Sequence, residues 1–182
     1  MLDNILNRRS TRRFTDQPVS DTHLELLLRA AMQAPSAKNE QPWEFLVIRK
    51  RETLLALSQA DPYAGAVKNA TTAIVLLCRM DACGETEGVT FWQQDMAAAA
   101  ENILLAAQEL GLGAVWLALA PVRSRMDYVQ TLLHLPEKLV PFAMIPLGCP
   151  VQWKAPDNRY DSRRVHYETA FPAEGCETSG TA

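Results

Sequence analysis

The sequence lacks a long hydrophobic run. No stretch approaches the ~20 apolar residues that a membrane-spanning helix needs. Residues 1–4 contain an acid, and the apolar segment of a secretory signal does not follow them. We therefore expect a cytoplasmic protein with no membrane partner.

Metal-binding and nucleophilic patterns are also missing. The four cysteines and three histidines show neither a CxxC pair nor another zinc spacing, which argues against a structural metal. The cysteines are most simply free thiols in a reducing compartment, and the apolar surroundings of Cys78 and Cys149 indicate burial. No Ser/His/Asp or Cys/His arrangement suggests covalent catalysis.

The composition is typical of one folded domain. The chain has 182 residues, of which 48% are hydrophobic and 21% charged, and it is long enough to bury a core. Neither an internal repeat nor a linker interrupts it. We expect a single α+β domain over residues 1–170 and a disordered tail over 171–182.

Hydrophobic spacing predicts helices over 2–8, from Ser20 or Asp21 to before Pro35, over 90–110, and near 125–134. The helix expected over 90–110 is rich in alanine. Its small residues, 97–100, suit either a buried central helix or a helix-to-helix dimer contact. Gly111 or Gly113 can end it.

Branched and aromatic residues predict strands over 43–49, 71–79, 114–119 and 140–147. The second is apolar on both faces, so we expect it at the centre of the sheet. Pro141 and Pro146 indicate an edge position or bulges for the last strand, because proline lacks the backbone donor that an inner strand uses.

Positive charge is concentrated at one place. The segment from Arg8 to Phe14 carries four arginines and two hydroxyls in a chain of net charge -3. Arginine suits phosphate because its planar fork donates paired hydrogen bonds. Scattered surface charge, which fits Arg13, and nucleic-acid binding are the alternatives. Nucleic-acid binding is disfavoured, because the sequence lacks a broad basic patch with interleaved aromatics.

An extended backbone would direct Arg8, Ser10 and Arg12 to one side, which favours a phosphate-bearing cofactor over surface charge. Further motifs follow in order: Ala34-Pro35-Ser36-Ala37-x-Asn39-x-Gln41-Pro42-Trp43, Glu101-Asn102-Ile103-Leu104, Leu110-Gly111-Leu112-Gly113-x-x-Trp116, Pro146-Leu147-Gly148-x-Pro150 and Arg159-Tyr160-Asp161-x-x-Arg164. Taken with the Arg8–Phe14 segment, this ordered set resembles the nitroreductase family of flavin enzymes.

The resemblance implies a three-layer α/β/α sandwich with a mostly antiparallel central sheet, and a homodimer with FMN at the subunit interface. It implies that Arg8, Arg9, Ser10 and Arg12 hold the FMN phosphate and ribityl chain, with Arg159 as a further phosphate contact. Pro35, Ser36, Ala37 and Asn39 would reach the flavin from the partner subunit. Trp116, Leu117 and Ala118 would lie against the isoalloxazine, where an N–H can face N5.

The implied activity is hydride transfer from NADH or NADPH to flavin N5, followed by reduction of a small electron-poor acceptor such as a nitroaromatic or a quinone, by a ping-pong mechanism. No catalytic side chain is then needed. A flavin-binding module without turnover, or a family member with a different substrate, is the alternative. The sequence leaves the choice of nucleotide open.

The sequence leaves two interpretations open for residues 61–70, for residues 84–92 and for Lys38. Residues 61–70 could be a loop over the site, with Lys68 or Asn69 near the cofactor, or a plain surface connection. Residues 84–92 could form a flap with Phe91 or Trp92 on the flavin ring, or those aromatics could be packing residues. Lys38 could lie near the flavin or point to solvent.

Overall fold

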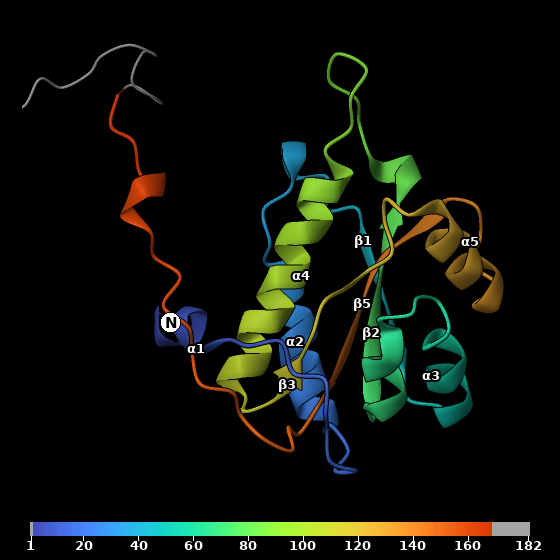
Figure 1. Cartoon of the computed structure of the whole chain (residues 1–182). Helices are drawn as coiled ribbons and strands as arrows, with labels where there is room; N and C mark the ends of the chain where they lie inside the picture. Colours follow the sequence, from blue (N-terminus) through green and yellow to red (C-terminus); the bar gives the residue numbers. More distant parts are fainter. Residues whose placement is uncertain (1, 169–182) are drawn as a thin grey trace, which may run out of the picture.

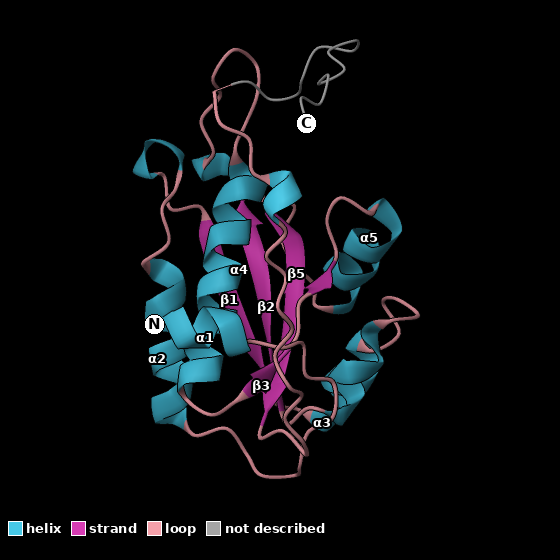
Figure 2. Cartoon of the chain, turned by 60° about the vertical axis from the view of Figure 1, so that its left-hand side comes forward, coloured by secondary structure: helices cyan, strands magenta, loops and turns pink. Residues whose placement is uncertain are grey.

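The structure is a computed structural model that describes residues 2–168. Five strands form one sheet in the order β1-β2-β5-β3, with β4 pairing β5 beside β3, and every pair is antiparallel. The strands are β1 (Trp43–Ile48), β2 (Thr72–Arg79), β3 (Gly113–Ala114), β4 (Leu117–Ala118) and β5 (Leu139–Gly148). Helices cover both faces of this sheet (Figures 1 and 2). The expected three-layer α/β/α architecture is confirmed.

One face of the sheet carries α2 (Asp21–Met32) and α4 (Trp92–Glu109), and α1 (Leu2–Asn7) lies against α4. The core on this side includes Leu27, Met96 and Ile145. The other face carries α3 (Arg51–Leu57), the 3-10 helix η2 (Ala64–Asn69) and α5 (Arg123–Leu132), around Leu54, Leu57 and Val129.

The long helices begin and end where the sequence predicts. Ser20 caps α2, since its side-chain oxygen accepts a hydrogen bond from the His23 backbone N–H at 3.1 Å. Gly111 follows α4 with φ of 68°, the left-handed conformation that a helix C-terminus commonly needs. Helix α3 was not predicted, because its seven residues bury only Leu54 and Leu57, too short a pattern to separate from a loop.

Two strand predictions need correction. The strand expected over 114–119 is two short strands, β3 and β4, separated by Val115 and Trp116. The strand expected at an edge, β5, lies inside the sheet, between β2 on one side and β3 and β4 on the other.

Both prolines of β5 occupy positions where a backbone donor is not required. Pro141 pairs with Leu77 at a register shift in the β2–β5 ladder, so the predicted bulge is present. The Pro146 carbonyl accepts from Val115 N–H at 3.3 Å. The absent N–H of Pro146 therefore faces the gap between β3 and β4.

Short 3-10 turns complete the described chain: η1 (Ala37–Asn39), η3 (Met80–Ala82) and η4 (Ser162–Arg164). Most of 151–168 has no regular structure. The predicted tail, 171–182, lies outside the described residues. Within residues 2–168, no helix combines the length and hydrophobicity needed to cross a membrane.

Candidate functional site

The arginine-rich segment runs extended along the open edge of β3. Ser10 forms a parallel bridge with Ala114, and the Thr11 N–H donates to the Ala114 carbonyl at 2.9 Å. The approach is close because Gly113 has no side chain: a Cβ at Gly113 would lie 2.5 Å from Thr11 Cγ2. Strand β3 thus fixes the position of the segment.

Arg8 and Arg9 form ion pairs on the α1 side of this segment. Arg8 Nε lies 3.4 Å from Glu101 of α4, and Arg9 Nη1 lies 2.7 Å from Asp157. Arg8, Arg9 and Arg159 line one cavity of about 310 Å³. The structure therefore brings together three of the five residues expected at the phosphate.

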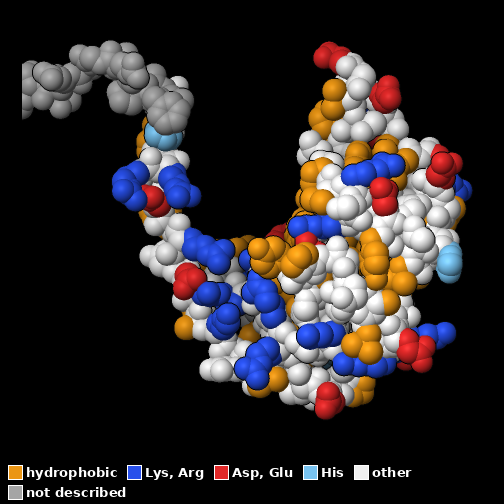
Figure 3. All heavy atoms as spheres, turned by 45° about the vertical axis from the view of Figure 1, so that its right-hand side comes forward, with side chains coloured by type: hydrophobic (Ala, Val, Ile, Leu, Met, Phe, Trp, Pro, Cys, Tyr) orange, Lys and Arg blue, Asp and Glu red, His pale blue; other side chains and the backbone are white. Residues whose placement is uncertain are grey.

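Arg12 lines a second cavity, with Trp153 and Lys154. Arg9 of the first cavity contacts Ala155 of the second, since its Nη1 donates to the Ala155 carbonyl at 2.6 Å. Within residues 2–168, Arg12 forms no ion pair, so its charge is available to an anion. Figure 3 shows Lys and Arg side chains gathered on this face, at the base of the C-terminal segment.

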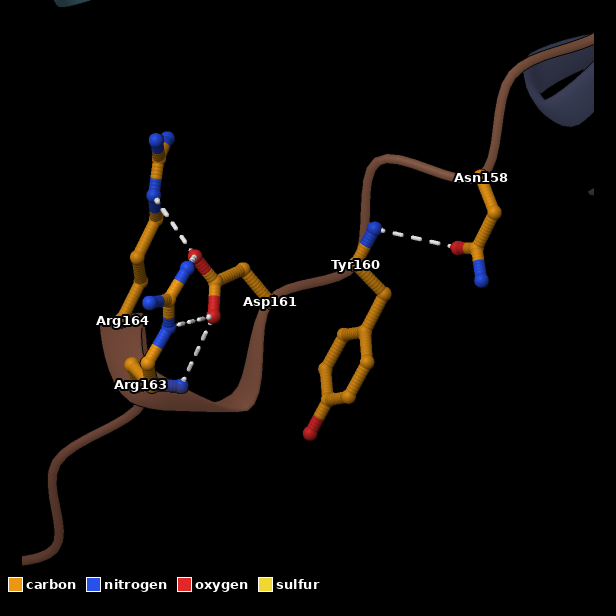
Figure 4. A network of polar contacts seen from close by, with 5 residues as sticks. All are labelled: Asn158, Tyr160, Asp161, Arg163 and Arg164. Atoms are coloured by element: carbon orange, nitrogen blue, oxygen red, sulfur yellow. Dashed lines mark hydrogen bonds and ion pairs between the residues drawn. The ribbon is translucent and has the colours of Figure 1, made fainter.

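The C-terminal segment has a local polar network of its own (Figure 4). Asp161 accepts hydrogen bonds from the backbone N–H of Arg163, at 3.2 Å, and from its guanidinium, at 2.9 and 3.0 Å. These bonds hold the pKa of the Asp161 carboxyl below its usual value. The network fixes the η4 turn and leaves Arg159 outside it.

The loop expected to reach the flavin, 35–41, lies at the start of α4. Its backbone is unusual, since Lys38, Asn39 and Gln41 have positive φ values of 51°, 57° and 50°. Strained, non-glycine backbone of this kind clusters at functional sites. The Ser36 hydroxyl accepts from Gln41 N–H at 3.0 Å, and Asn39 Oδ1 accepts from the Gln41 side chain at 3.2 Å.

A buried acid holds this loop, and the sequence interpretation missed it. The Asp95 carboxylate, in the first turn of α4, accepts a hydrogen bond from the Ala37 backbone N–H at 2.9 Å. The available signal was an acid inside the apolar stripe of α4. Lys38 is exposed, and its Nζ donates to the Glu85 carbonyl at 3.0 Å.

The third expected part of the site is the edge of the sheet at Trp116–Ala118. The Trp116 ring packs edge-on against Phe142, with the two ring centroids 5.5 Å apart. Trp92 packs on the same Phe142 from α4, at 6.0 Å, so Trp92 is a packing residue. Ala118 is exposed.

The backbone of Ala118 points out of the sheet. The Leu119 N–H donates to the Phe142 carbonyl of β5 at 3.0 Å, whereas the Ala118 carbonyl accepts from Arg125 Nη1 at 3.1 Å. Successive residues of a strand face opposite sides, so the Ala118 N–H also faces away from β5. This edge presents the outward backbone donor that the resemblance requires near N5.

Arg125 and Asp61 are a further pair that the sequence did not indicate. Arg125 Nη2 forms an ion pair with Asp61 Oδ2, and the Asp61 side chain is 8% exposed. The Tyr63 N–H donates to Asp61 Oδ1 at 2.6 Å. The start of the 61–70 segment is thereby connected to Ala118, whereas Lys68 and Asn69 line a separate cavity beside α3.

Within one chain, the residues expected to bind FMN do not all lie in one place. Arg8, Arg9, Ser10, Arg12 and Arg159 lie around the extended segment, and Trp116–Ala118 continue the same sheet edge. Within residues 2–168, no hydrogen bond or ion pair joins the 35–41 loop to either group. Residues 2–168 contain no cluster of three His, Cys, Asp or Glu side chains suited to a metal ion.

Solved structures share this fold. An NADH oxidase, provisionally so named, from Clostridium acetobutylicum superposes with a TM-score of 0.88 at 45% identity, covering 92% of this chain and 99% of that one. A provisionally named nitroreductase from Desulfovibrio desulfuricans, solved in complex with FMN, has a TM-score of 0.77 at 34% identity, over 94% and 97% of the two chains.

The family follows from sequence comparison. The model of the Nitroreductase family matches residues 5–63 and 55–149. A protein of Archaeoglobus fulgidus, provisionally named NADH dehydrogenase/NAD(P)H nitroreductase, is 43% identical over 170 residues, which are 92% of this chain and 97% of the relative. The chain belongs to the nitroreductase family, as its motifs indicate.

Proposed function

We propose that this chain is a cytoplasmic, FMN-dependent oxidoreductase that works as a homodimer, takes electrons from NADH or NADPH, and reduces a nitroaromatic, a quinone or a similar electron-poor acceptor by a ping-pong mechanism. Residues 1–170 would form its single domain. The observation that carries the proposal is the cavity that Arg8, Arg9 and Arg159 line together with Glu101 and Asp157, next to the segment that pairs with β3, in a chain of the nitroreductase family.

The residues present suit the phosphate end of FMN. Arg8 and Arg9 are each held in place by a carboxylate, and Arg12 is unpaired within the described chain. A dianionic phosphate can bind such a set through charge-assisted hydrogen bonds. Ser10, held against Ala114, would add a hydroxyl donor, and Arg159 would approach from the C-terminal segment.

The residues at Trp116–Ala118 suit the flavin ring. The packed Trp116 and the exposed Ala118 offer a flat, mostly apolar edge with one outward N–H donor. When bound, FMN would supply the redox chemistry as a hydride carrier at its N5 atom. The chain's own part is to hold the ring, and the Ala118 N–H, fixed by strand β4, would stabilise negative charge there without reorganising.

The homodimer is supported by what one chain leaves exposed. Helix α1 buries none of its residues, and Leu2, Ile5 and Leu6 are 67%, 51% and 59% exposed. A largely apolar hollow of about 570 Å³ lies beside Ile5, between α2 and α4. A second copy covering this face would bring its Pro35, Ser36, Ala37 and Asn39 to the flavin.

Purification tests the proposal directly. We expect a yellow dimer whose flavin absorbance bleaches on addition of NADH or NADPH and returns with a nitroaromatic or quinone. A colourless protein that takes up no FMN would refute the cofactor. A yellow dimer that NAD(P)H does not reduce would instead identify a flavin-binding module without this electron donor.

A further inference from the structure

Two cysteines that the proposed flavin chemistry does not use lie in contact. Cys78 is buried near the end of β2, and Cys83 follows the η3 turn, five residues later. Their sulfur atoms are 3.4 Å apart. By contrast, Cys149 is half-buried rather than buried as expected, and within residues 2–168 it contacts neither of them.

The geometry allows the two sulfur atoms to bond with little movement. A disulfide needs a separation of about 2 Å, so the sulfurs must approach by roughly 1.4 Å. Cys78 is fixed in the sheet, where it pairs with Trp43 of β1. Cys83 ends a three-residue 3-10 turn and is partly exposed, so its side chain and turn can supply the movement.

We propose that Cys78 and Cys83 form a reversible intramolecular disulfide when the protein meets a hydroperoxide such as hydrogen peroxide. The partly exposed Cys83 thiolate attacks the peroxide oxygen; the O–O bond breaks, giving a sulfenic acid and hydroxide, which is protonated to water. The Cys78 sulfur then displaces this oxygen as a second water. In total, two thiols lose two protons and two electrons to one peroxide, which becomes two waters. A dithiol reductant reverses the reaction by thiol–disulfide exchange.

The bond would fix the base of the segment that touches the 35–41 loop. Gly84, directly after Cys83, lies so close to Glu40 that a Cβ there would be 2.5 Å from Glu40 Oε1. One residue further, the Glu85 carbonyl accepts from Lys38. Movement of Cys83 toward β2 is thus transmitted to the loop that carries Asn39.

The surroundings make the reaction slow at neutral pH. Burial raises the pKa of the Cys78 thiol, and the contact with Cys83 raises it further. Burial, together with nearby carboxylates, also raises the pKa of Cys83, although its contact with Cys78 opposes this. Since the thiolate is the nucleophile, oxidation should accelerate about tenfold for each pH unit below the Cys83 pKa. The charged groups around the pair are Lys38, Glu40, Arg79, Asp81, Asp95 and Lys138.

The test is peptide mapping of the full-length, FMN-loaded protein after peroxide treatment at about pH 8 to 9, where the thiolate fraction is larger. Trypsin cleaves after Lys68, Arg79 and Arg123, so Cys78 and Cys83 lie in different peptides, 69–79 and 80–123. Cys149 and Cys176 fall in two others. We expect the intact mass to fall by about 2 Da, the peptides 69–79 and 80–123 to become linked, and dithiothreitol to separate them.

Matched variants make the result decisive. Cys83→Ser should abolish the linked peptide, and Cys149→Ser should leave it unchanged. The proposal is wrong if peroxide converts Cys83 to a sulfinic acid without the link, or if the intact protein forms a different cysteine pair. It is equally wrong if dithiothreitol does not restore the thiols. Because the readout is the mass of the peptides, the result stands whether or not the protein proves to be a flavin enzyme.

Discussion

The Arg125 side chain connects the edge strand β4 to the segment that begins at Asp61. Its guanidinium contacts the buried Asp61 on one side and the Ala118 carbonyl on the other. It therefore holds the edge strand from outside the sheet, and it places a positive charge, offset by Asp61, beside the proposed position of the flavin ring.

Asp61→Asn should raise the reduction potential of the flavin. The substitution leaves the Arg125 charge without its counterion, and an uncompensated cation favours the reduced, more negative flavin. We expect a positive shift of roughly 30 mV or more for the two-electron couple, measured by dye-linked titration. Asp127→Asn is the control, because Asp127 pairs with Arg123 on the exposed surface of α5. An unchanged or lower potential in Asp61→Asn would show that Arg125 does not act on the flavin.

Arg12→Ala should weaken FMN binding without unfolding the protein. Arg12 is exposed and forms no ion pair within residues 2–168, so its removal leaves no carboxylate unpaired. Loss of one charge-assisted hydrogen bond costs about 1.5–3 kcal/mol, or roughly ten- to a hundredfold in Kd, as measured by fluorescence titration of FMN. Arg123→Ala should bind normally, because Arg123 is exposed on α5 and pairs there with Asp127. Equal affinity in both variants would remove Arg12 from the site.

At the scale of the elements, β3 and the extended segment 10–15 depend on each other. The segment bonds to Ala114 at one end and to Cys149 at the other, where the Thr15 N–H donates to the Cys149 carbonyl at 2.8 Å. Two short elements thus set the direction of Arg8, Ser10 and Arg12. A shift of this backbone would move Ser10 and Arg12 together, while Arg159 approaches from the C-terminal segment.

Gly113→Ala should displace the segment and lower FMN occupancy, with the native sheet retained. The new Cβ would lie 2.5 Å from Thr11 Cγ2, a distance that forces one backbone to move and costs about 1–3 kcal/mol of stability. Flavin content per subunit and the thermal midpoint measure the two effects. Gly65→Ala is the control, because a Cβ there meets no atom within 4 Å. If Gly113→Ala retains full flavin, the close approach at β3 does not position the site.

At the scale of the whole molecule, the helices on the two faces of the sheet differ in how much apolar surface they leave exposed. The α3 and α5 side closes over its own core. The α2 and α4 side leaves α1 without a buried residue and Met32 at 49% exposure. An apolar surface of this kind is typical of a contact between subunits.

Ile5→Asp should yield a monomer that does not retain FMN. A carboxylate placed in the proposed interface would lose its hydration, at a cost of several kcal/mol. Light scattering and flavin absorbance on one gel-filtration run measure mass and cofactor together. Leu55→Asp, an exposed position on α3 across the sheet, should remain a yellow dimer. A dimeric, flavin-bound Ile5→Asp protein would place the interface elsewhere.

The sequence by itself determined the elements whose residues follow a repeating pattern. Apolar spacing predicted α2, which buries Leu27 and Ala31. The continuous apolar run of β2 lies inside the sheet, as predicted. The Arg8–Phe14 segment was identified because its charge stands out on an acidic chain. These features are local, since spacing and composition along a few residues contain the information.

Only the tertiary structure decided which distant residues meet. Strand β5 can lie inside the sheet because neither of its prolines needs a backbone N–H there: Pro141 lies at a bulge, and Pro146 faces the gap between β3 and β4. The contacts Ala37–Asp95, Asp61–Arg125 and Cys78–Cys83 arise because the packed sheet and helices bring the paired side chains to the same point. A single sequence contains the residue types but not these distances, since the distances are set by how the whole core closes.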